Sequence, residues 1–336
     1  MNILIIGLGS IGQRHLRNIN KLKFKKKIFI LRKKFFTPTL SSKLQIIKTR
    51  IEKKYKINFI KKLEEVKKLK IDLALICTPT AFHISQAVYL INNNINTFVE
   101  KPLGSNLKDL NNLRKAILKN KNVKTMVGYQ LKFNPMIKKI KLLLQKRLVG
   151  KICSIEVKNG EHIKNFHPYE DYKNSYAAIK KLGGGVVLTQ SHELDLLMFL
   201  FSDHKISKIK SINSKMTNLK INVEDTSMSI LEFKKNNKNI FICSLILNYY
   251  EIPKSKNITI IGENGKIKAD FIKKTIILNY EKNSKKYKFK FNKDKVFETE
   301  INYFINCIRN KKKINQLFTI NQSINVLKNS IKILRN

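Results

Sequence analysis

A glycine turn near the start of the chain constrains the fold more than any other feature. Gly7, Gly9 and Gly12 stand between an apolar run, Asn2 to Ile6, and a helical stretch from about Gln13 to Lys21. In this order of strand, turn and helix, Gly7 permits a tight turn, Gly9 lets the backbone approach a pyrophosphate, and Gly12 allows the helix to pack closely on the strand. The spacing therefore predicts a dinucleotide site, with a purely structural turn as the alternative.

The residues that follow the turn indicate which dinucleotide is bound. The helix start at Ser10 and Ile11 is expected to offer free N–H groups to the pyrophosphate. An acidic residue about 20 positions further on holds the adenosine ribose of NAD. Here that place is taken by Arg32 and Lys33, and the first acidic residue is Glu52. Cations suit the extra 2′-phosphate of NADP, so NADP is predicted as the preferred cofactor. Because lysine is abundant throughout, NAD stays open.

The pattern of apolar runs predicts two domains. Strand-like runs alternate with helical stretches as far as residue 123, which is typical of an α/β Rossmann domain with a doubly wound parallel sheet. Beyond it strand-like segments dominate, with one strongly helical stretch at 191–201 and closing helices at about 298–310 and 321–334. We expect a dinucleotide-binding domain over residues 1–123 and an α+β domain with a large, mainly antiparallel sheet over 124–336.

Composition narrows the classes of partner. The formal net charge is +45, which by itself would favour nucleic acid or an anionic membrane surface. Lysine supplies nearly all of this charge, it is dispersed, and Trp is absent, so specific nucleic-acid binding is not predicted. No run is long enough to span a membrane, and the four cysteines lie far apart. We expect a soluble cytoplasmic protein with reduced thiols.

Further motifs follow the glycine turn in a specific order. They are Cys77-Thr78-Pro79-Thr80-Ala81-Phe82-His83, Glu100-Lys101-Pro102-Leu103, Gly128-Tyr129-Gln130 with Phe133-Asn134-Pro135, Gly183-Gly184-Gly185 leading to His192-Glu193-Leu194-Asp195, and Val223-Glu224-Asp225-Thr226. In this combination the chain resembles, over essentially its whole length, the family of glucose–fructose oxidoreductase, inositol dehydrogenase and rhizopine catabolism proteins (Gfo/Idh/MocA).

The resemblance implies an NADP- or NAD-dependent oxidoreductase. Such an enzyme transfers a hydride between the nicotinamide and a hydroxyl or keto carbon of a sugar, sugar acid, cyclitol or nucleotide-linked sugar. Some members act on precursors of bacterial surface sugars. The alternative is a non-catalytic NAD(P)-binding sensor or partner protein that has kept the glycine turn and lost the chemistry.

By similarity, Lys101 lies near the nicotinamide and the reacting carbon, and the Lys101–Pro102 bond is expected to be cis. An ammonium beside a developing alkoxide stabilises its negative charge, which suits a catalytic lysine. Without the motif, Lys101 would be interpreted as one more solvated lysine. The resemblance also implies cofactor contacts from the residues of the two central motifs: Thr78, Pro79, Thr80, His83, Glu100 and Lys101.

His192 is the predicted proton carrier. An imidazole titrates near neutral pH, so it can take the hydroxyl proton as the hydride leaves and return it in the reverse reaction. Thr189, His192 and Asp195 are spaced three apart and would share one helix face if the helix extends back that far. Close relatives tend to carry Asp where Thr189 stands, so Asp195 or Glu193 is expected to compensate. A structural histidine that caps the helix is the alternative.

The remaining predictions concern the substrate and the assembly. A polar, tyrosine-rich segment at 167–176 resembles a loop over a sugar pocket, and its Tyr172 and Tyr176 are candidate substrate contacts. Tyr129 and Thr189 are further candidates beside Lys101 and His192. No ligand spacing supports a metal site, and hydride transfer to a nicotinamide needs none. The exposed face of the second sheet is expected to join copies of the chain into a dimer or tetramer, as in relatives.

Overall fold

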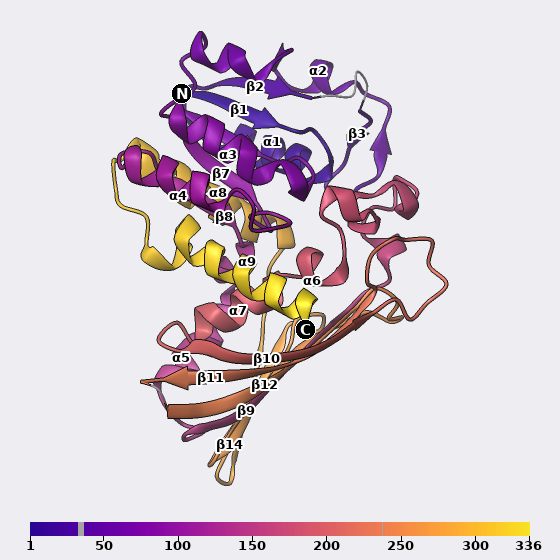
Figure 1. The fold of residues 1–336 in the computed structure, drawn as a ribbon, viewed down its shortest axis with the longest axis vertical. Helices are drawn as coiled ribbons and strands as arrows, with labels where there is room; N and C mark the ends of the chain where they lie inside the picture. The colour runs from indigo at the N-terminus through magenta and orange to yellow at the C-terminus, as the bar shows by residue number, and fades with distance from the viewer. Residues whose placement is uncertain (33–36, 237) are drawn as a thin grey trace.

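The computed structural model describes residues 1–32, 37–236 and 238–336. At its amino-terminal end, six parallel strands form one sheet in the order β5-β2-β1-β6-β7-β8 (Figure 1). The central strands are apolar and buried on both faces, as a sheet covered by helices requires. The strands are β1 (Asn2–Ile6), β2 (Lys27–Leu31), β5 (Asn58–Ile60), β6 (Leu73–Ile76), β7 (Asn96–Glu100) and β8 (Thr125–Gly128).

Helices cover both faces of this sheet. The helix α1 (Ser10–Lys21) buries Leu16 and Ile19 at helical spacing against it. The other helices of this half are α2 (Ile51–Lys54), α3 (His83–Asn92) and α4 (Leu110–Lys119). A helix from the end of the chain, α8 (Lys293–Arg309), packs on α1. The carboxyl-terminal chain therefore returns to the first domain.

The second half is built on an eight-stranded sheet in the order β10-β11-β12-β9-β13-β14-β15-β16. Neighbouring strands are antiparallel except β9 and β12, which are parallel. The strands are β9 (Ile152–Gly160), β10 (Lys205–Ser214), β11 (Thr226–Lys235), β12 (Lys238–Asn248), β13 (Ser255–Gly262), β14 (Gly265–Asp270), β15 (Thr275–Tyr280) and β16 (Asn283–Lys288). The predicted fold class, a Rossmann half followed by a large and mainly antiparallel sheet, is confirmed.

Helices cover only one face of the large sheet, and its other face is open to solvent (Figure 1). The covering helices are α5 (Pro135–Gln145), α6 (Val186–Thr189), α7 (His192–Leu200) and α9 (Ile320–Arg335). Each strand alternates side chains between the two faces, so one set packs under these helices and the other set faces outward. Among the helices of the described residues, none combines the length and the apolar character that a membrane-spanning segment needs.

Three details differ from the sequence-based expectations. The parallel sheet continues past residue 123, because β8 pairs with β7. The stretch that follows β8 forms the helix α5, whereas the sequence pattern predicted mainly strands there. Asn134 caps this helix and Pro135 occupies its first turn. The condition under which Thr189, His192 and Asp195 would share one helix face is not met, because α6 ends at Thr189 and α7 begins at His192.

Candidate active site

The reason why glycine is present differs among the three positions of the first turn. A Cβ at Gly7 would lie 2.6 Å from the carbonyl oxygen of Cys77, and one at Gly12 would lie 2.1 Å from that of Gly7. Both positions therefore require glycine for packing. A Cβ at Gly9 would meet nothing within 4 Å. The fold itself leaves this position free, which is expected where a ligand rather than the protein must approach the backbone.

The start of α1 provides the matching anion site. Gly9 is its N-cap residue and supplies no side-chain cap, so the N–H of Ile11 keeps its hydrogen-bonding capacity. Tyr169, from the tyrosine-rich segment of the second half, contacts Ser10 through both its backbone and its side chain. These features fit the pyrophosphate of a dinucleotide, and the Tyr169 contact brings the second half over that position.

Arg32 lies directly after β2, at the edge where the ribose of a dinucleotide is held in this fold. Its Nη2 lies 3.0 Å from Glu52 Oε1, and its guanidinium stacks 4.3 Å from the centre of the Phe59 ring. The sequence did not indicate either partner, because both come from distant segments. Lys33, the other predicted cation of this edge, lies outside the described residues.

The residues after β6 join two loops of the site. The Thr78 hydroxyl donates a hydrogen bond to Gln86, and Thr80 is buried in the turn that Pro79 introduces. The ring nitrogens of His83 lie 2.8 Å from the carbonyl oxygens of Thr78 and Pro102. With its side chain buried, His83 holds the loop after β6 against the loop after β7. By fixing these two loops, His83 supports the predicted cofactor site.

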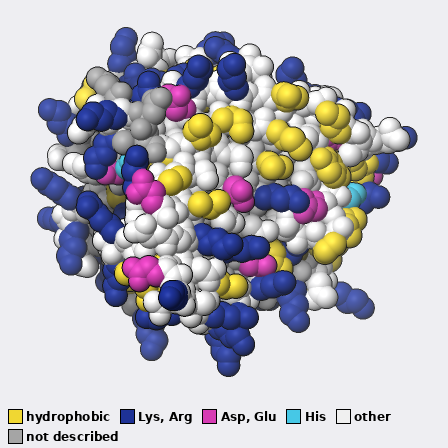
Figure 2. Space-filling model, turned by 90° about the horizontal axis from the view of Figure 1, so that it is seen from below, with side chains coloured by type: hydrophobic (Ala, Val, Ile, Leu, Met, Phe, Trp, Pro, Cys, Tyr) yellow, Lys and Arg dark blue, Asp and Glu magenta, His cyan; other side chains and the backbone are white. Residues whose placement is uncertain are grey.

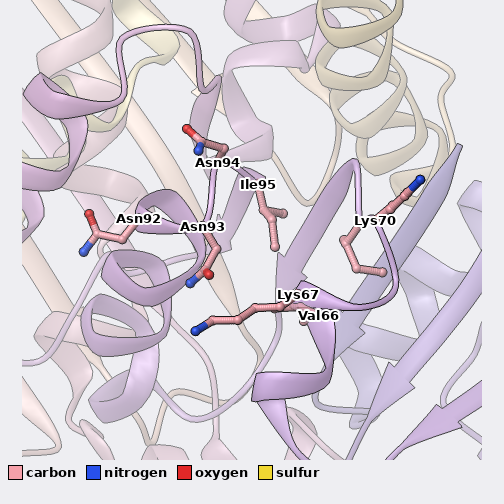
Figure 3. Close-up of a pocket in the computed structure, with 8 residues that line it drawn as sticks. Val66, Lys67, Lys70, Asn92, Asn93, Asn94 and Ile95 are labelled. Carbon is pink, nitrogen blue, oxygen red and sulfur yellow. The ribbon is translucent and has the colours of Figure 1, made fainter.

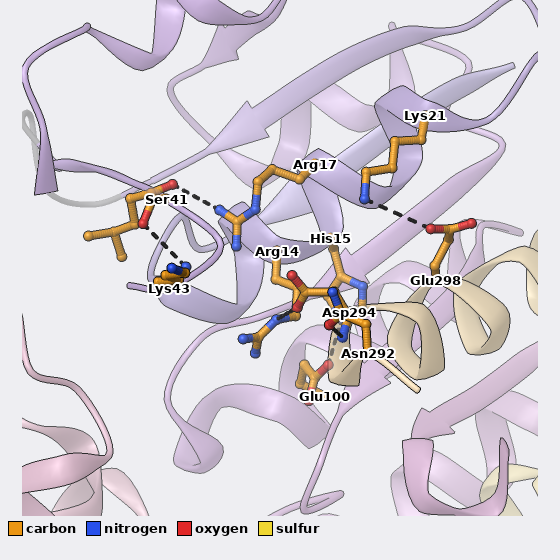
Figure 4. A network of polar contacts seen from close by, with 11 residues as sticks. Arg14, His15, Arg17, Lys21, Ser41, Lys43, Glu100, Asn292, Asp294 and Glu298 are labelled. Atoms are coloured by element: carbon orange, nitrogen blue, oxygen red, sulfur yellow. Dashed lines mark hydrogen bonds and ion pairs between the residues drawn. The ribbon is translucent and has the colours of Figure 1, made fainter. Parts of the chain in front are cut away.

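Glu100 and Lys101 stand at the end of β7 and are held by different partners. Figure 4 shows His15 of α1 beside Glu100. The distance between His15 Nε2 and Glu100 Oε1 is 2.6 Å. The Lys101 backbone N–H donates to Glu100 Oε2, and the Lys101–Pro102 bond is cis, as expected. The Lys101 ammonium donates to the carbonyl oxygen of Thr189 at 2.6 Å. Burial lowers the pKa of Lys101, and the hydrogen bond to Thr189 fixes the position of its amino group.

His192 begins α7 and lies near Lys101. Its ring packs edge-on against Tyr129, with 5.7 Å between ring centres, and its Nδ1 is buried with no partner among the described residues. Burial and the nearby positive charges of Lys101, Lys256 and Lys293 lower the pKa of His192 well below its usual value. The imidazole is therefore neutral at physiological pH, the state that accepts a proton.

The carboxylates expected to support His192 have other partners. Asp195 pairs with Lys132 at 2.8 Å and Glu193 pairs with Lys256 at 2.5 Å. Neither has a hydrogen bond to the imidazole, because each is engaged by a buried or half-buried lysine. The Thr189 hydroxyl bonds instead to the Gly185 carbonyl and to Tyr249. The backbone carbonyl of Thr189 positions Lys101, and contact of Thr189 with the substrate stays a prediction.

The three candidate tyrosines differ in position. Tyr129 is fully buried with its hydroxyl 3.5 Å from Ser191 Oγ, so it supports the start of α7. The Tyr172 hydroxyl accepts a hydrogen bond from the backbone of Lys220, and Tyr176 packs 6.4 Å from the ring of His167. Their contact with substrate stays a prediction. A separate pocket at the amino ends of β6 and β7, lined by residues such as Lys70 and Asn94, contains none of these side chains (Figure 3).

The first domain is a Rossmann sheet whose glycine turn is free at Gly9, and it carries Lys101. The second domain places the neutral His192 near this lysine. Together these features define the class of nicotinamide-dependent oxidoreductases. Comparison with known protein families supports the same class. Residues 1–129 match the model described as "Oxidoreductase family, NAD-binding Rossmann fold". Residues 137–268 match the GFO/IDH/MocA C-terminal domain. The chain belongs to the Gfo/Idh/MocA family of oxidoreductases.

Individual relatives are distant. Oxidoreductase P35 of Formosa agariphila is 27% identical over 211 residues, and this match spans 62% of each chain. Myo-inositol 2-dehydrogenase of Thermotoga maritima is 23% identical over 285 residues, 83% of this chain and 78% of that protein. The structure of the WlbA dehydrogenase from Bordetella pertussis, in complex with NADH and UDP-GlcNAcA, has a TM-score of 0.77 at 18% identity and covers 100% of this chain and 95% of that one.

Proposed function

We propose that the protein transfers a hydride between NADP or NAD and a hydroxyl-bearing carbon of a sugar, sugar acid, cyclitol or nucleotide-linked sugar. The observation that carries the proposal is the placement of Lys101 beside His192. Lys101 donates to the carbonyl of Thr189, three residues before His192, and its positive charge lowers the pKa of that imidazole. A neutral base can accept the hydroxyl proton, and a fixed ammonium can stabilise the negative charge that develops on the oxygen.

In the oxidation direction the residues have separate tasks. His192 accepts the proton of the substrate hydroxyl on its neutral ring, and Lys101 stabilises the negative charge that develops on the oxygen. When bound, the nicotinamide supplies the two-electron hydride acceptor for the C–H bond that breaks. The glycine turn and the start of α1 would hold the pyrophosphate. In the reductive direction His192 returns the proton and Lys101 polarises the carbonyl.

The cation at the end of β2 supports a preference for NADP. Arg32 can form paired hydrogen bonds with a 2′-phosphate, and the Phe59 ring holds the guanidinium in place. Glu52 shares this cation and would compete with the phosphate. The preference for NADP over NAD is therefore expected to be moderate.

The open face of the large sheet supports assembly into a dimer or tetramer. Large apolar side chains are exposed on adjacent strands, and Figure 2 shows apolar side chains gathered on the face seen from below. Ile212 of β10, Ile230 of β11 and Ile242 of β12 are between 51% and 70% exposed. An apolar patch of this kind marks an interface. Light scattering on the wild type and on Ile230→Lys tests it, and a wild type that is monomeric at micromolar concentration would contradict it.

The function itself is tested by turnover. Purified protein is supplied with NADP⁺ or NAD⁺ and a panel of sugars, sugar acids, cyclitols and nucleotide-linked sugars, and formation of the reduced nicotinamide is followed. Oxidation of at least one substrate, lost in His192→Asn, is the expected result. Tight cofactor binding without turnover of any substrate in either direction would support a non-catalytic sensor instead.

A further inference from the structure

The orientation of the His192 ring has no polar contact to account for it. Of its two ring nitrogens, only Nδ1 is buried with no hydrogen-bond partner among the described residues. Nε2 is thus the nitrogen left to accept the substrate proton, and for this the neutral ring has to carry its own proton on Nδ1. A hydrogen bond from Nδ1 to a carboxylate or a backbone carbonyl commonly fixes that tautomer. Here another contact has to do so.

Tyr129 packs directly on this imidazole. The two rings are nearly perpendicular, at 82°, with 5.7 Å between their centres, and Tyr129 is fully buried. In such a pair the edge of one ring faces the π face of the other. A ring N–H that points at an electron-rich π face makes a weak hydrogen bond. The Tyr129 ring is therefore a group that can receive the Nδ1 proton of His192 in place of an oxygen acceptor.

Tyr129 is itself held by contacts with the start of α7. Its hydroxyl lies 3.5 Å from the Oγ of Ser191, the residue before His192. The Lys132 ammonium lies 5.4 Å from the centre of the Tyr129 ring, and the same ammonium pairs with Asp195 at 2.8 Å. The ring is therefore connected to α7 on both sides of His192. A group fixed in this way can fix the orientation of its neighbour.

We propose that Tyr129 is a positioning residue, whose ring holds the imidazole of His192 with Nδ1 toward itself and with Nε2 free for the substrate. Tyr129 acts through His192 and takes no part in proton transfer. Its hydroxyl is buried beside Ser191, and burial raises its pKa, so the phenol stays protonated. The inference rests on the proposed function, because that function makes His192 the proton acceptor. The orientation of the ring, however, is measurable without substrate or cofactor.

The test reads the tautomer of His192 from the ¹⁵N chemical shifts of its ring nitrogens, in protein labelled with ¹⁵N-histidine at pH 7.5. His192→Asn identifies its signals among those of the six histidines. Tyr129→Phe keeps the aromatic ring, and Tyr129→Leu removes it. Phe233→Leu is the matched control, because Phe233 is also fully buried and stacks on Phe241 of the large sheet. The kcat, KM and cofactor affinity of the same proteins are then measured.

The wild type and Tyr129→Phe should carry the proton on Nδ1. Tyr129→Leu should shift it to Nε2, the tautomer that free histidine prefers in water, and should lower kcat by about tenfold to a hundredfold with little change in KM or cofactor affinity. Phe233→Leu should keep both the tautomer and the kcat.

Two outcomes would overturn the positioning role on the tautomer alone. They are a proton on Nε2 in the wild type, which needs no variant to fold, and an unchanged tautomer in folded Tyr129→Leu. A loss of kcat in Tyr129→Phe as large as that in Tyr129→Leu would assign the hydroxyl to the reaction and would also overturn it. A proton on Nδ1 in a protein that turns over no substrate would support the ring orientation and contradict the proposed function instead.

Discussion

Asp195 forms an ion pair with Lys132 at 2.8 Å, and both side chains are almost completely buried. Asp195 lies three residues after His192 on α7, whereas Lys132 belongs to a short 3₁₀ turn, Gln130–Phe133, which follows β8. The Lys132 ammonium also donates to the carbonyl of Leu317, in the chain that returns before α9. The pair thus connects three segments at the helix that carries the proposed base.

Breaking this pair on one side should be strongly destabilising. Lys132→Met leaves Asp195 buried without its partner, so the free energy of unfolding should fall by about 3–5 kcal/mol. The double variant with Asp195→Leu removes both charges and should recover most of the loss. Urea unfolding measures each value. Lys158→Met is the control, because it breaks a half-exposed pair with Glu251 and should cost less than about 1 kcal/mol. A double variant no more stable than the single one would contradict the account.

The pH dependence of turnover should report the environment of His192. Its pKa lies well below the usual 6.5, so the base stays deprotonated between pH 7 and pH 8. The rate in the oxidation direction should be flat there and fall only at lower pH. His192→Asn should lower kcat by about 10²–10⁴ with unchanged cofactor affinity, and His162→Asn should not. An acidic limb centred at or above pH 6.5 would contradict this.

Lys101→Met should have two effects that can be separated. Loss of the ammonium beside the developing alkoxide should lower kcat by about 10²–10³. Because Lys101 is one of the charges that lower the pKa of His192, its removal should also move the acidic limb of the residual activity to higher pH. A pH profile of kcat/KM for both proteins measures the shift. A lowered rate with an unmoved limb would show that Lys101 does not act on His192.

Cofactor preference should depend on the contact between Arg32 and Glu52. Glu52→Gln frees the guanidinium and should tighten NADPH binding by about threefold to tenfold, with little effect on NADH. Arg32→Asp should shift the preference toward NADH by about tenfold or more. Fluorescence titration with both cofactors measures the ratio of affinities. An unchanged ratio in Arg32→Asp would show that the end of β2 does not contact the 2′-phosphate.

Glu300 should make stability depend on pH. It is fully buried in α8, and burial followed by the charge of Glu100 raises its pKa well above the usual value. The folded state therefore binds this proton more tightly than the unfolded state, and stability is lost as the pH rises above about 4.5, the unfolded pKa. Glu300→Gln should raise the free energy of unfolding at pH 8 by about 1–3 kcal/mol. At pH 4 the two proteins should have similar free energies of unfolding. A gain of equal size at both pH values would show that the ionisation of Glu300 is not the cause.

The parts of the fold that sequence could predict are those set by local pattern. Local features include the glycine turn, the buried strands of the first half and the Glu100-Lys101-Pro102 motif. From these features alone, the cofactor was predicted to bind at the carboxyl ends of β1 and β7. The partners of the site residues are not local. The contacts Arg32–Glu52 and Lys256–Glu193 join segments 20 and 63 positions apart. In a chain with 68 Lys and Arg residues, nothing in the sequence distinguished Lys256, which pairs with the buried Glu193, from the solvated lysines.

The most direct test of the account is cofactor binding by the wild type and by Gly9→Val. Both proteins, freed of carried-over cofactor, are titrated with NADPH and NADH at physiological salt while nicotinamide fluorescence is followed. Since a Cβ at Gly9 meets nothing within 4 Å, the variant should fold with unchanged thermal stability. The wild type is expected to bind both cofactors saturably and NADPH more tightly, and Gly9→Val is expected to lose this binding. Binding of neither cofactor to the folded wild type, or equal binding to the variant, would contradict the assignment of the glycine turn as a dinucleotide site.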